Sequence, residues 1–244
     1  MSDGVRINKF LASCGLGSRR GCEEIVSHGR VTVNGKVVTD LATRILPDDA
    51  IKVDGKRVWS GEETTILLYK PKGHICTKED THDRTTIYDL LPGRFQRLNY
   101  VGRLDKESEG LLLLTSSGEV SQTLTHPKHK IEKEYEVVID RPLEKDHAEK
   151  MVEGIHTAEG IATAERVEVL GQRRVSVVLK QGLKRQIRLM FGKFDYKVKK
   201  LVRVRIGELI APTMKAGDWV ELDEEGIELA MTNPPKPKKP KDAV

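Results

Sequence analysis

The N-terminal part of the chain shows two helical patterns followed by two hairpin patterns. Apolar residues at i, i+3, i+4 and i+7 predict a first helix: Ile7, Phe10, Leu11 and Cys14. Ser18 suits an N-cap, and a second apolar face follows at Cys22, Ile25 and Val26. The dipeptides Asn34-Gly35 and Asp54-Gly55 lie between short β-branched runs and predict two β-hairpins. These elements fit a small module, which we place at residues 5–60.

From residue 64 onward, strands and helices are mixed without a regular repeat. The predicted strands cover residues 65–69, 133–139, 163–170, 174–179, 201–206 and 219–222. The predicted helices cover 85–91 and 118–125, and a further helix opens at 181–183 and continues to Phe194. We therefore predict an α+β fold, with a mainly antiparallel sheet in a domain at residues 64–230. Residues 232–244 contain four prolines and four lysines, and we predict a disordered basic tail there.

A charged, glycine-bounded segment at residues 102–110 runs directly into the four leucines Leu111–Leu114. The leucines predict a strand buried on both faces, although periodicity alone also allows a buried helix. The charged segment is then a loop at the edge of a core, where catalytic groups often lie. Asp105, close to Arg103 and to an apolar wall, is the candidate carboxylate. The alternative is a surface turn with solvated charges.

Basic residues gather around the predicted N-terminal helices and the start of the hairpin: Arg6, Lys9, Arg19, Arg20, Arg30 and Lys36. Lys plus Arg number 42 against 37 Asp plus Glu, and the pI is about 9.0, which favours a polyanionic partner. Arg19 and Arg20 fall in the first turn of a helix, where the macrodipole disfavours cations. Phosphate is the obvious ligand for them, and an unliganded basic face is the alternative.

A second basic cluster occupies residues 184–205: Lys184, Arg185, Arg188, Arg203 and Arg205. Period-two alternation predicts that Arg203 and Arg205 share one face of a strand. Cations of this kind would keep a nearby carboxylate ionised and attract phosphate. An ionised aspartate can act as a nucleophile or as a base, but this pattern does not identify a reaction.

Other classes of protein are disfavoured by what the sequence lacks. No Gly-x-Gly-x-x-Gly follows a strand and no Walker-type loop occurs, which argues against dinucleotide and ATP enzymes. The three cysteines and seven histidines have no metal-ligand spacing, so we expect no metal. The odd cysteine count without an apolar signal segment predicts a cytoplasmic protein, and no apolar run is long enough for a membrane helix.

The segment Gly102-Arg103-Leu104-Asp105 resembles the signature of pseudouridine synthases that modify bacterial ribosomal RNA. The resemblance covers residues 5–222 and implies an enzyme that breaks the bond between uracil and ribose, rotates the base and rejoins it through carbon. Such enzymes use no cofactor and no metal. The resemblance maps the catalytic aspartate onto Asp105, either as nucleophile or for proton removal from the sugar. It also implies that Tyr135 stacks on the uracil, that Arg188 pairs with the aspartate and that Arg103 holds the target nucleotide out of its stack.

The N-terminal blocks at residues 6–11, 17–20 and 29–36 resemble the S-four-type RNA-binding module. The implied partner is ribosomal RNA or an assembling ribosomal subunit, and we expect a monomer with no membrane partner and no nucleotide cofactor. Residues 126–135 and 198–207 look more like synthases of the large subunit than of the small subunit. The alternative hypothesis is a catalytically silent RNA-binding factor for ribosome assembly.

Overall fold

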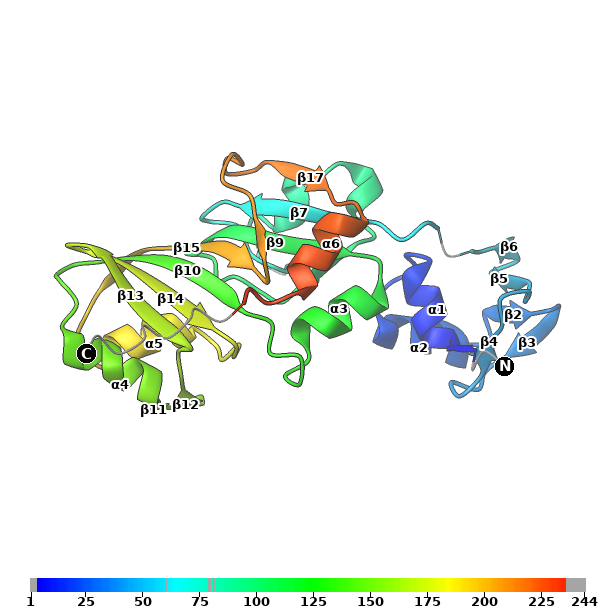
Figure 1. Ribbon diagram of the computed structural model, residues 1–244. Coiled ribbons are helices and arrows are strands. Elements are labelled where there is room, and N and C mark those ends of the chain that lie inside the picture. The colour runs from blue at the N-terminus through cyan, green and yellow to red at the C-terminus, as the bar shows by residue number, and fades with distance from the viewer. Residues whose placement is uncertain (1–3, 60, 79, 81, 236–244) are drawn as a thin grey trace. The chain divides into compact units, whose positions relative to one another are not determined.

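A computed structural model describes residues 4–59, 61–78, 80 and 82–235, and its chain forms two compact units (Figure 1). One unit contains the chain up to Thr64 together with segments 92–99 and 115–118, and the other contains the remainder. The predicted tail from residue 236 onward lies outside the described residues. Asn233, which we had assigned to that tail, is instead anchored, because it accepts a hydrogen bond from Glu132 N at 2.7 Å and donates one to Lys130 O at 3.1 Å.

The N-terminal unit packs two helices against a small antiparallel sheet. Its elements are β1 (Val5–Arg6), α1 (Ile7–Ser13), α2 (Arg19–Ser27), β2 (Val31–Val33), β3 (Lys36–Val38), β4 (Arg44–Ile45), β5 (Ile51–Val53) and β6 (Lys56–Arg57). The four-stranded sheet has the order β3-β2-β5-β6. Ser18 caps α2 by accepting a hydrogen bond from Gly21 N at 3.1 Å. Asn34 and Asp54 adopt positive φ with the glycines that follow them, which confirms both predicted hairpins.

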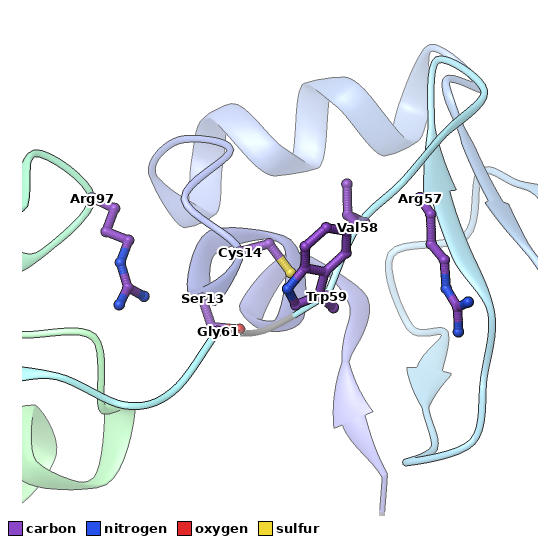
Figure 2. Close-up of a pocket in the computed structure, with 7 residues that line it drawn as sticks. All are labelled: Ser13, Cys14, Arg57, Val58, Trp59, Gly61 and Arg97. Atoms are coloured by element: carbon purple, nitrogen blue, oxygen red, sulfur yellow. The ribbon is translucent and has the colours of Figure 1, made fainter. Parts of the chain in front are cut away.

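The core of this unit lies between the helices and one face of the sheet. It consists of Ile7, Leu11, Cys22, Val26, Val31, Ile45, Ile51 and Val53. Beyond β6, Val58 and Trp59 line a hollow beside Ser13 and Cys14, at the C-terminal end of α1 (Figure 2).

The larger unit is built on a nine-stranded sheet. Its main path is β13-β14-β10-β15-β9-β7-β17, with β16 paired to β15 and β8 paired to β9. The strands are β7 (Thr65–Lys70), β8 (Asn99–Val101), β9 (Glu109–Thr115), β10 (Lys133–Ile139), β13 (Arg166–Gly171), β14 (Arg174–Leu179), β15 (Val198–Ile206), β16 (Leu209–Ile210) and β17 (Trp219–Glu221). Strands β15 and β9 pair in parallel, and β10 pairs antiparallel to β14 and to β15. The fold is thus α+β, as predicted.

Helices and a hairpin complete this unit: α3 (Gly118–Thr125), α4 (Lys145–Glu153), α5 (Gln186–Gly192), α6 (Glu224–Met231), and the hairpin β11 (Ile155–Thr157) and β12 (Gly160–Ala162). One core cluster includes residues of β10, β14, α4 and α5, and another includes residues of β9, α3 and α6. The four leucines form a strand rather than a helix, and each is at most 1% exposed.

Several predicted boundaries were wrong. The helix expected from residue 181 begins at Gln186, because Arg185 adopts a left-handed conformation with φ of 54°. Gln186 is buried and donates to Thr163 O at 3.0 Å, which fixes the preceding turn. The helix expected at 85–91 is only a 3₁₀ turn (Ile87–Leu90), and α6 was not predicted.

Gly110 allows the close approach of β9 to β15. Its φ is +105°, and a Cβ built on it would lie 2.2 Å from Arg203 O and 2.6 Å from Arg203 N. Because both atoms belong to the backbone, only separation of the two strands could relieve the clash.

Gly110→Ala should therefore lower the free energy of unfolding by about 3 kcal/mol or more, as measured by chemical denaturation. Gly171→Ala is the control, since nothing lies within 4 Å of that position; equal stability of the two variants would contradict this account.

Candidate active site

The loop that bears Asp105 is held by hydrogen bonds to five consecutive carbonyl groups, those of residues 104–108. The donors are Cys76 Sγ to Leu104 O (3.4 Å), Lys70 Nζ to Asp105 O (3.2 Å), Gly73 N to Lys106 O (2.8 Å), Arg188 Nη2 to Glu107 O (3.0 Å) and Lys70 Nζ to Ser108 O (2.8 Å). Ser108 N also donates to Asp105 O at 3.0 Å, which closes a turn. The backbone of the Asp105 loop is therefore fixed by the end of β7, by the segment that follows β7 and by α5.

Lys70 is the central donor of this arrangement. Its side chain is fully buried at the end of β7, and its ammonium donates to Pro71 O at 3.0 Å as well as to the carbonyls of Asp105 and Ser108. Three carbonyls match the three hydrogens of an ammonium group. Burial lowers the pKa of Lys70, and nearby carboxylates including Asp105 oppose that shift. Sequence analysis missed this residue, although Lys70 shares the strand face of the buried Ile66 and Leu68.

The Asp105 carboxylate remains partly accessible, with its side chain 32% exposed. The Nη1 atom of Arg185 lies 3.9 Å from Asp105 Oδ2. Arg185 is also a non-glycine residue at positive φ, a conformation that is uncommon and concentrated at functional sites.

The pairing of Arg188 with Asp105 that the resemblance implies stays a prediction. Arg188 donates to Glu107 O at 3.0 Å and to Val198 O at 3.3 Å, so it holds the loop that bears the carboxylate. Burial, followed by the neighbouring Arg185, lowers the pKa of Arg188, whereas Asp105 and Glu107 oppose the shift. Arg188 thus lies within the electrostatic range of Asp105. Its Nε is buried and has no hydrogen-bond partner among the described residues.

Tyr135 lies in the same sheet as the strand that follows the Asp105 loop. The register aligns Tyr135 of β10 with Arg203 of β15, and Arg203 with Gly110 of β9. Two strand spacings separate Tyr135 from Gly110, roughly 10 Å. In the pairing of β10 with β15, a β-bulge lies between Glu134 and Tyr135. Bulges next to active sites commonly redirect a side chain. Tyr135 itself is half-buried against the core of β10, β14 and α5.

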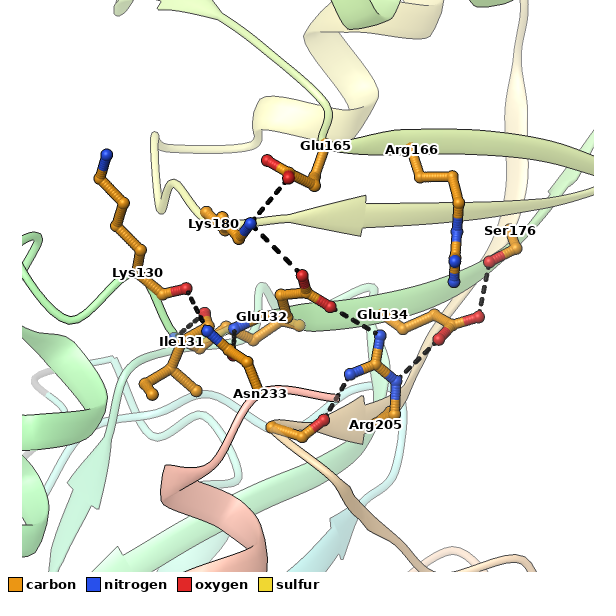
Figure 3. A network of polar contacts seen from close by, with 12 residues as sticks. Lys130, Ile131, Glu132, Glu134, Glu165, Arg166, Ser176, Lys180, Arg205 and Asn233 are labelled. Carbon is orange, nitrogen blue, oxygen red and sulfur yellow. Dashed lines mark hydrogen bonds and ion pairs between the residues drawn. The ribbon is translucent and has the colours of Figure 1, made fainter. Parts of the chain in front are cut away.

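Arg203 and Arg205 were predicted to contact RNA, and the structure corrects this prediction. Their exposures are only 4% and 9%, because β15 is a central strand whose two faces are covered. Arg203 Nε donates to Leu111 O at 2.6 Å. Arg205 belongs to the polar network of Figure 3: it lies 2.8 Å from Glu134 and 3.2 Å from Glu132, and donates to Gly207 O.

The same network extends to neighbouring strands. Lys180 Nζ lies 2.7 Å from Glu165 and 3.4 Å from Glu132, and Ser176 Oγ donates to Glu134 Oε1 at 2.7 Å (Figure 3). These contacts join β10, β14 and β15 next to Tyr135 and give Arg205 a structural role.

The remaining predicted RNA-contact residues are on the surface. Exposed side chains belong to Arg6, Lys9, Arg19, Arg20, Lys36, Arg103, Lys184 and Arg185. Arg30 is also exposed but forms a bidentate pair with Asp54, with Nη2 at 2.5 Å and Nε at 3.0 Å from its carboxylate. Arg30 therefore stabilises the β5–β6 hairpin.

Within the described ranges, no group of three or more His, Cys, Asp or Glu side chains is arranged to hold a metal ion. Across the same residues, none of the helices has the length and hydropathy required to cross a membrane.

Replacing Lys70 tests whether it positions the Asp105 loop. Lys70→Met keeps an unbranched side chain, one atom shorter, but leaves the carbonyls of Asp105 and Ser108 without their ammonium donor. We expect about 2 kcal/mol lower stability in chemical denaturation. Lys72→Met is the matched control: Lys72 is 58% exposed and pairs with Glu107 at 3.0 Å, so its loss should change stability by about 0.5 kcal/mol at most. Similar losses in both variants would count against a special role for Lys70.

Comparisons with known proteins agree with this architecture. Residues 5–51 match the S4 domain, and residues 64–193 match a family described as RNA pseudouridylate synthase. The chain is 35% identical to the ribosomal large subunit pseudouridine synthase B of Bacillus subtilis, over 89% of this chain and 91% of that protein. It is 36% identical to the protein of the same name from Vibrio cholerae, over 89% of this chain and 71% of that protein.

A solved structure also resembles the whole chain. The crystal structure of a pseudouridylate synthase aligns with a TM-score of 0.68 at 29% identity, covering 93% of this chain and all of that one. An S4 domain is therefore followed by a synthase domain with a mixed sheet, and the chain belongs to the RNA pseudouridylate synthase family, whose members are isomerases.

Proposed function

We propose that this protein converts a specific uridine of large-subunit ribosomal RNA to pseudouridine, without a cofactor or a metal. The named relatives from Bacillus subtilis and Vibrio cholerae, similar over most of this chain, support the large subunit as the source of the substrate. We further propose that the protein acts as a cytoplasmic monomer on ribosomal RNA or on an assembling subunit.

The observation that carries this proposal is the half-buried carboxylate of Asp105 on a fixed loop beside Arg185. Isomerisation breaks the bond between ribose and a uracil nitrogen and forms one to a uracil carbon. The nitrogen gains a proton and the carbon loses one, so the reaction needs a group that accepts a proton. An aspartate carboxylate can accept that proton, and can alternatively attack the sugar as a nucleophile. Both routes use the same carboxylate.

Neighbouring side chains have distinct roles in the proposal. In this proposal Tyr135 stacks on the uracil. Its half-buried position at the edge of a core and its place next to a bulge support that role. Arg185 is the ion partner of Asp105, and Arg188 fixes the loop through Glu107 O.

Binding energy elsewhere on the protein must offset the cost of extruding a base from its stack, a few kcal/mol. Arg103 and Lys184 are exposed and lie in the segments that contain Asp105 and Arg185, which supports contacts with the target strand in this proposal. The basic residues of the S4 domain then bind nearby phosphates. An RNA-binding assembly factor without activity is the alternative, and the presence of Asp105, Tyr135 and Arg188 favours the enzyme.

Asp105→Asn should abolish isomerisation, because an amide is neither an effective base nor a nucleophile, while RNA affinity changes less than about three-fold. The measurement is tritium release from large-subunit RNA labelled at the uracil carbon that exchanges its proton. Glu107→Gln is the control, since Glu107 is an exposed carboxylate paired with Lys72. Wild-type turnover by Asp105→Asn would refute the catalytic role of Asp105.

Arg19→Ala combined with Arg20→Ala should weaken RNA binding and make it less sensitive to salt. If each arginine neutralises one phosphate, the slope of log K against log salt should fall by about 1.5, as measured by fluorescence anisotropy. Arg173→Ala with Arg174→Ala removes two adjacent exposed arginines near the β13–β14 turn and serves as the control. An unchanged slope in the first double variant would show that Arg19 and Arg20 do not contact phosphate.

A further inference from the structure

The outer face of the S4-domain sheet is defined by strand register. Direct cross-strand partners place Val37, Thr32, Lys52 and Arg57 on one face, in the order of their strands. The residues that alternate with them on β2 and β5 face the helices and form the core. Val37 is 64% exposed, and Lys52 and Arg57 are also exposed. This face is therefore the side of the sheet turned away from α1 and α2.

Positive charge on this face is not balanced within the unit. Lys52 and Arg57 are direct cross-strand partners, and like charges in such positions repel. Lys56 is a further exposed cation of this hairpin, next to Arg57 in sequence but aligned with Val53 on the opposite face. Asp54, the carboxylate of the same hairpin, is already paired with Arg30 at 2.5 Å. In the portion of the chain that the structure describes, neither Lys52 nor Arg57 forms an ion pair, so an external anion would stabilise this arrangement.

Trp59 provides a large aromatic surface next to these cations. It follows Arg57 by two positions and is 70% exposed, which is the highest exposure among the large exposed hydrophobic residues of the described chain. In Figure 2 its indole lies beside Cys14 in the hollow at the end of α1. Burial raises the pKa of the Cys14 thiol to about 11, so the thiol is neutral and behaves as an apolar contact. The hollow therefore combines apolar side chains with a cation.

We propose that Trp59 and Arg57 form a binding subsite for an unpaired nucleotide of RNA, with the base stacked on the indole and the phosphate bound by Arg57 and Lys52. Stacking on aromatic side chains combined with cations that follow the phosphates is a general means of binding single strands. The unbalanced charge favours a polyanion over a protein partner. The subsite differs from the phosphate contacts proposed for Arg19 and Arg20, which lie on α2. The choice of RNA as ligand rests on the proposed function.

A tryptophan fluorescence titration tests the stacking directly. The chain has two tryptophans, so Trp219→Phe leaves Trp59 as the only one. The full-length variant is titrated with a short single-stranded oligouridylate and, separately, with an RNA duplex of equal charge. We expect saturable quenching by the single strand and little quenching by the duplex, whose bases are already stacked. Absent quenching, or equal quenching by both RNAs, would overturn the proposal.

Affinity measurements with three substitutions separate stacking from general apolar contact. Trp59→Ala should bind the oligouridylate about ten-fold more weakly, Trp59→Phe should stay within about three-fold of wild type, and Trp59→Leu should resemble Trp59→Ala. Ile210→Ala removes another exposed apolar side chain, in the synthase domain, and should have no effect. Wild-type affinity for Trp59→Ala or Trp59→Leu would overturn the proposal.

These measurements are independent of isomerisation. If the wild type isomerises no uridine but Trp59 variants lose single-strand binding, the proposed enzyme activity fails and the subsite stands. If the enzyme is active and the Trp59 variants bind normally, only the subsite fails.

Discussion

The buried ammonium of Lys70 is the interaction on which the candidate site depends. A charge without exposure is costly unless it is fully hydrogen-bonded, and here three backbone carbonyls satisfy it. Two of these carbonyls belong to Asp105 and Ser108, so the cation connects the end of β7 to the loop that precedes β9. The backbone carbonyl of Asp105 is fixed by Lys70, while the carboxylate remains partly exposed. Such preorganisation suits the catalytic role proposed for Asp105, because the reacting group is then in place before the substrate arrives.

The sheet extends this rigidity across the site. Gly110 allows β9 to approach β15, and Arg203 closes the contact by donating to Leu111 O. Arg205, also on β15, forms ion pairs with Glu132 and Glu134. These two residues lie at the start of β10, just before Tyr135. The arginines of β15 thus hold strands together, while the guanidinium groups of Arg185 and Arg188, from the start of α5, face the Asp105 loop.

Sequence predicted most of the elements and the loop of Asp105, because hairpin turns, helical periodicity and a leucine run are local signals. It could not predict the partner of Asp105, because the choice between Arg185 and Arg188 depends on a left-handed backbone at Arg185. The alternation of Arg203 and Arg205 indicated a solvent-facing side, but β15 is central and both faces are covered. The alternation of β7 puts Lys70 on the same strand face as Ile66 and Leu68, which indicates burial. A lysine at the end of a strand ordinarily reaches solvent, so this pattern alone did not predict a buried ammonium.

The most direct test of this account is to map pseudouridine in transcribed small- and large-subunit ribosomal RNA, and in partly assembled subunits, after incubation with the wild-type protein. Chemical adduct formation followed by reverse transcription locates each modified base. The account predicts a single new pseudouridine, in the large-subunit RNA. Absence of any modified uridine from both RNAs and from the assembling particles, with binding retained, would contradict it and leave an RNA-binding protein that keeps the residues of an enzyme.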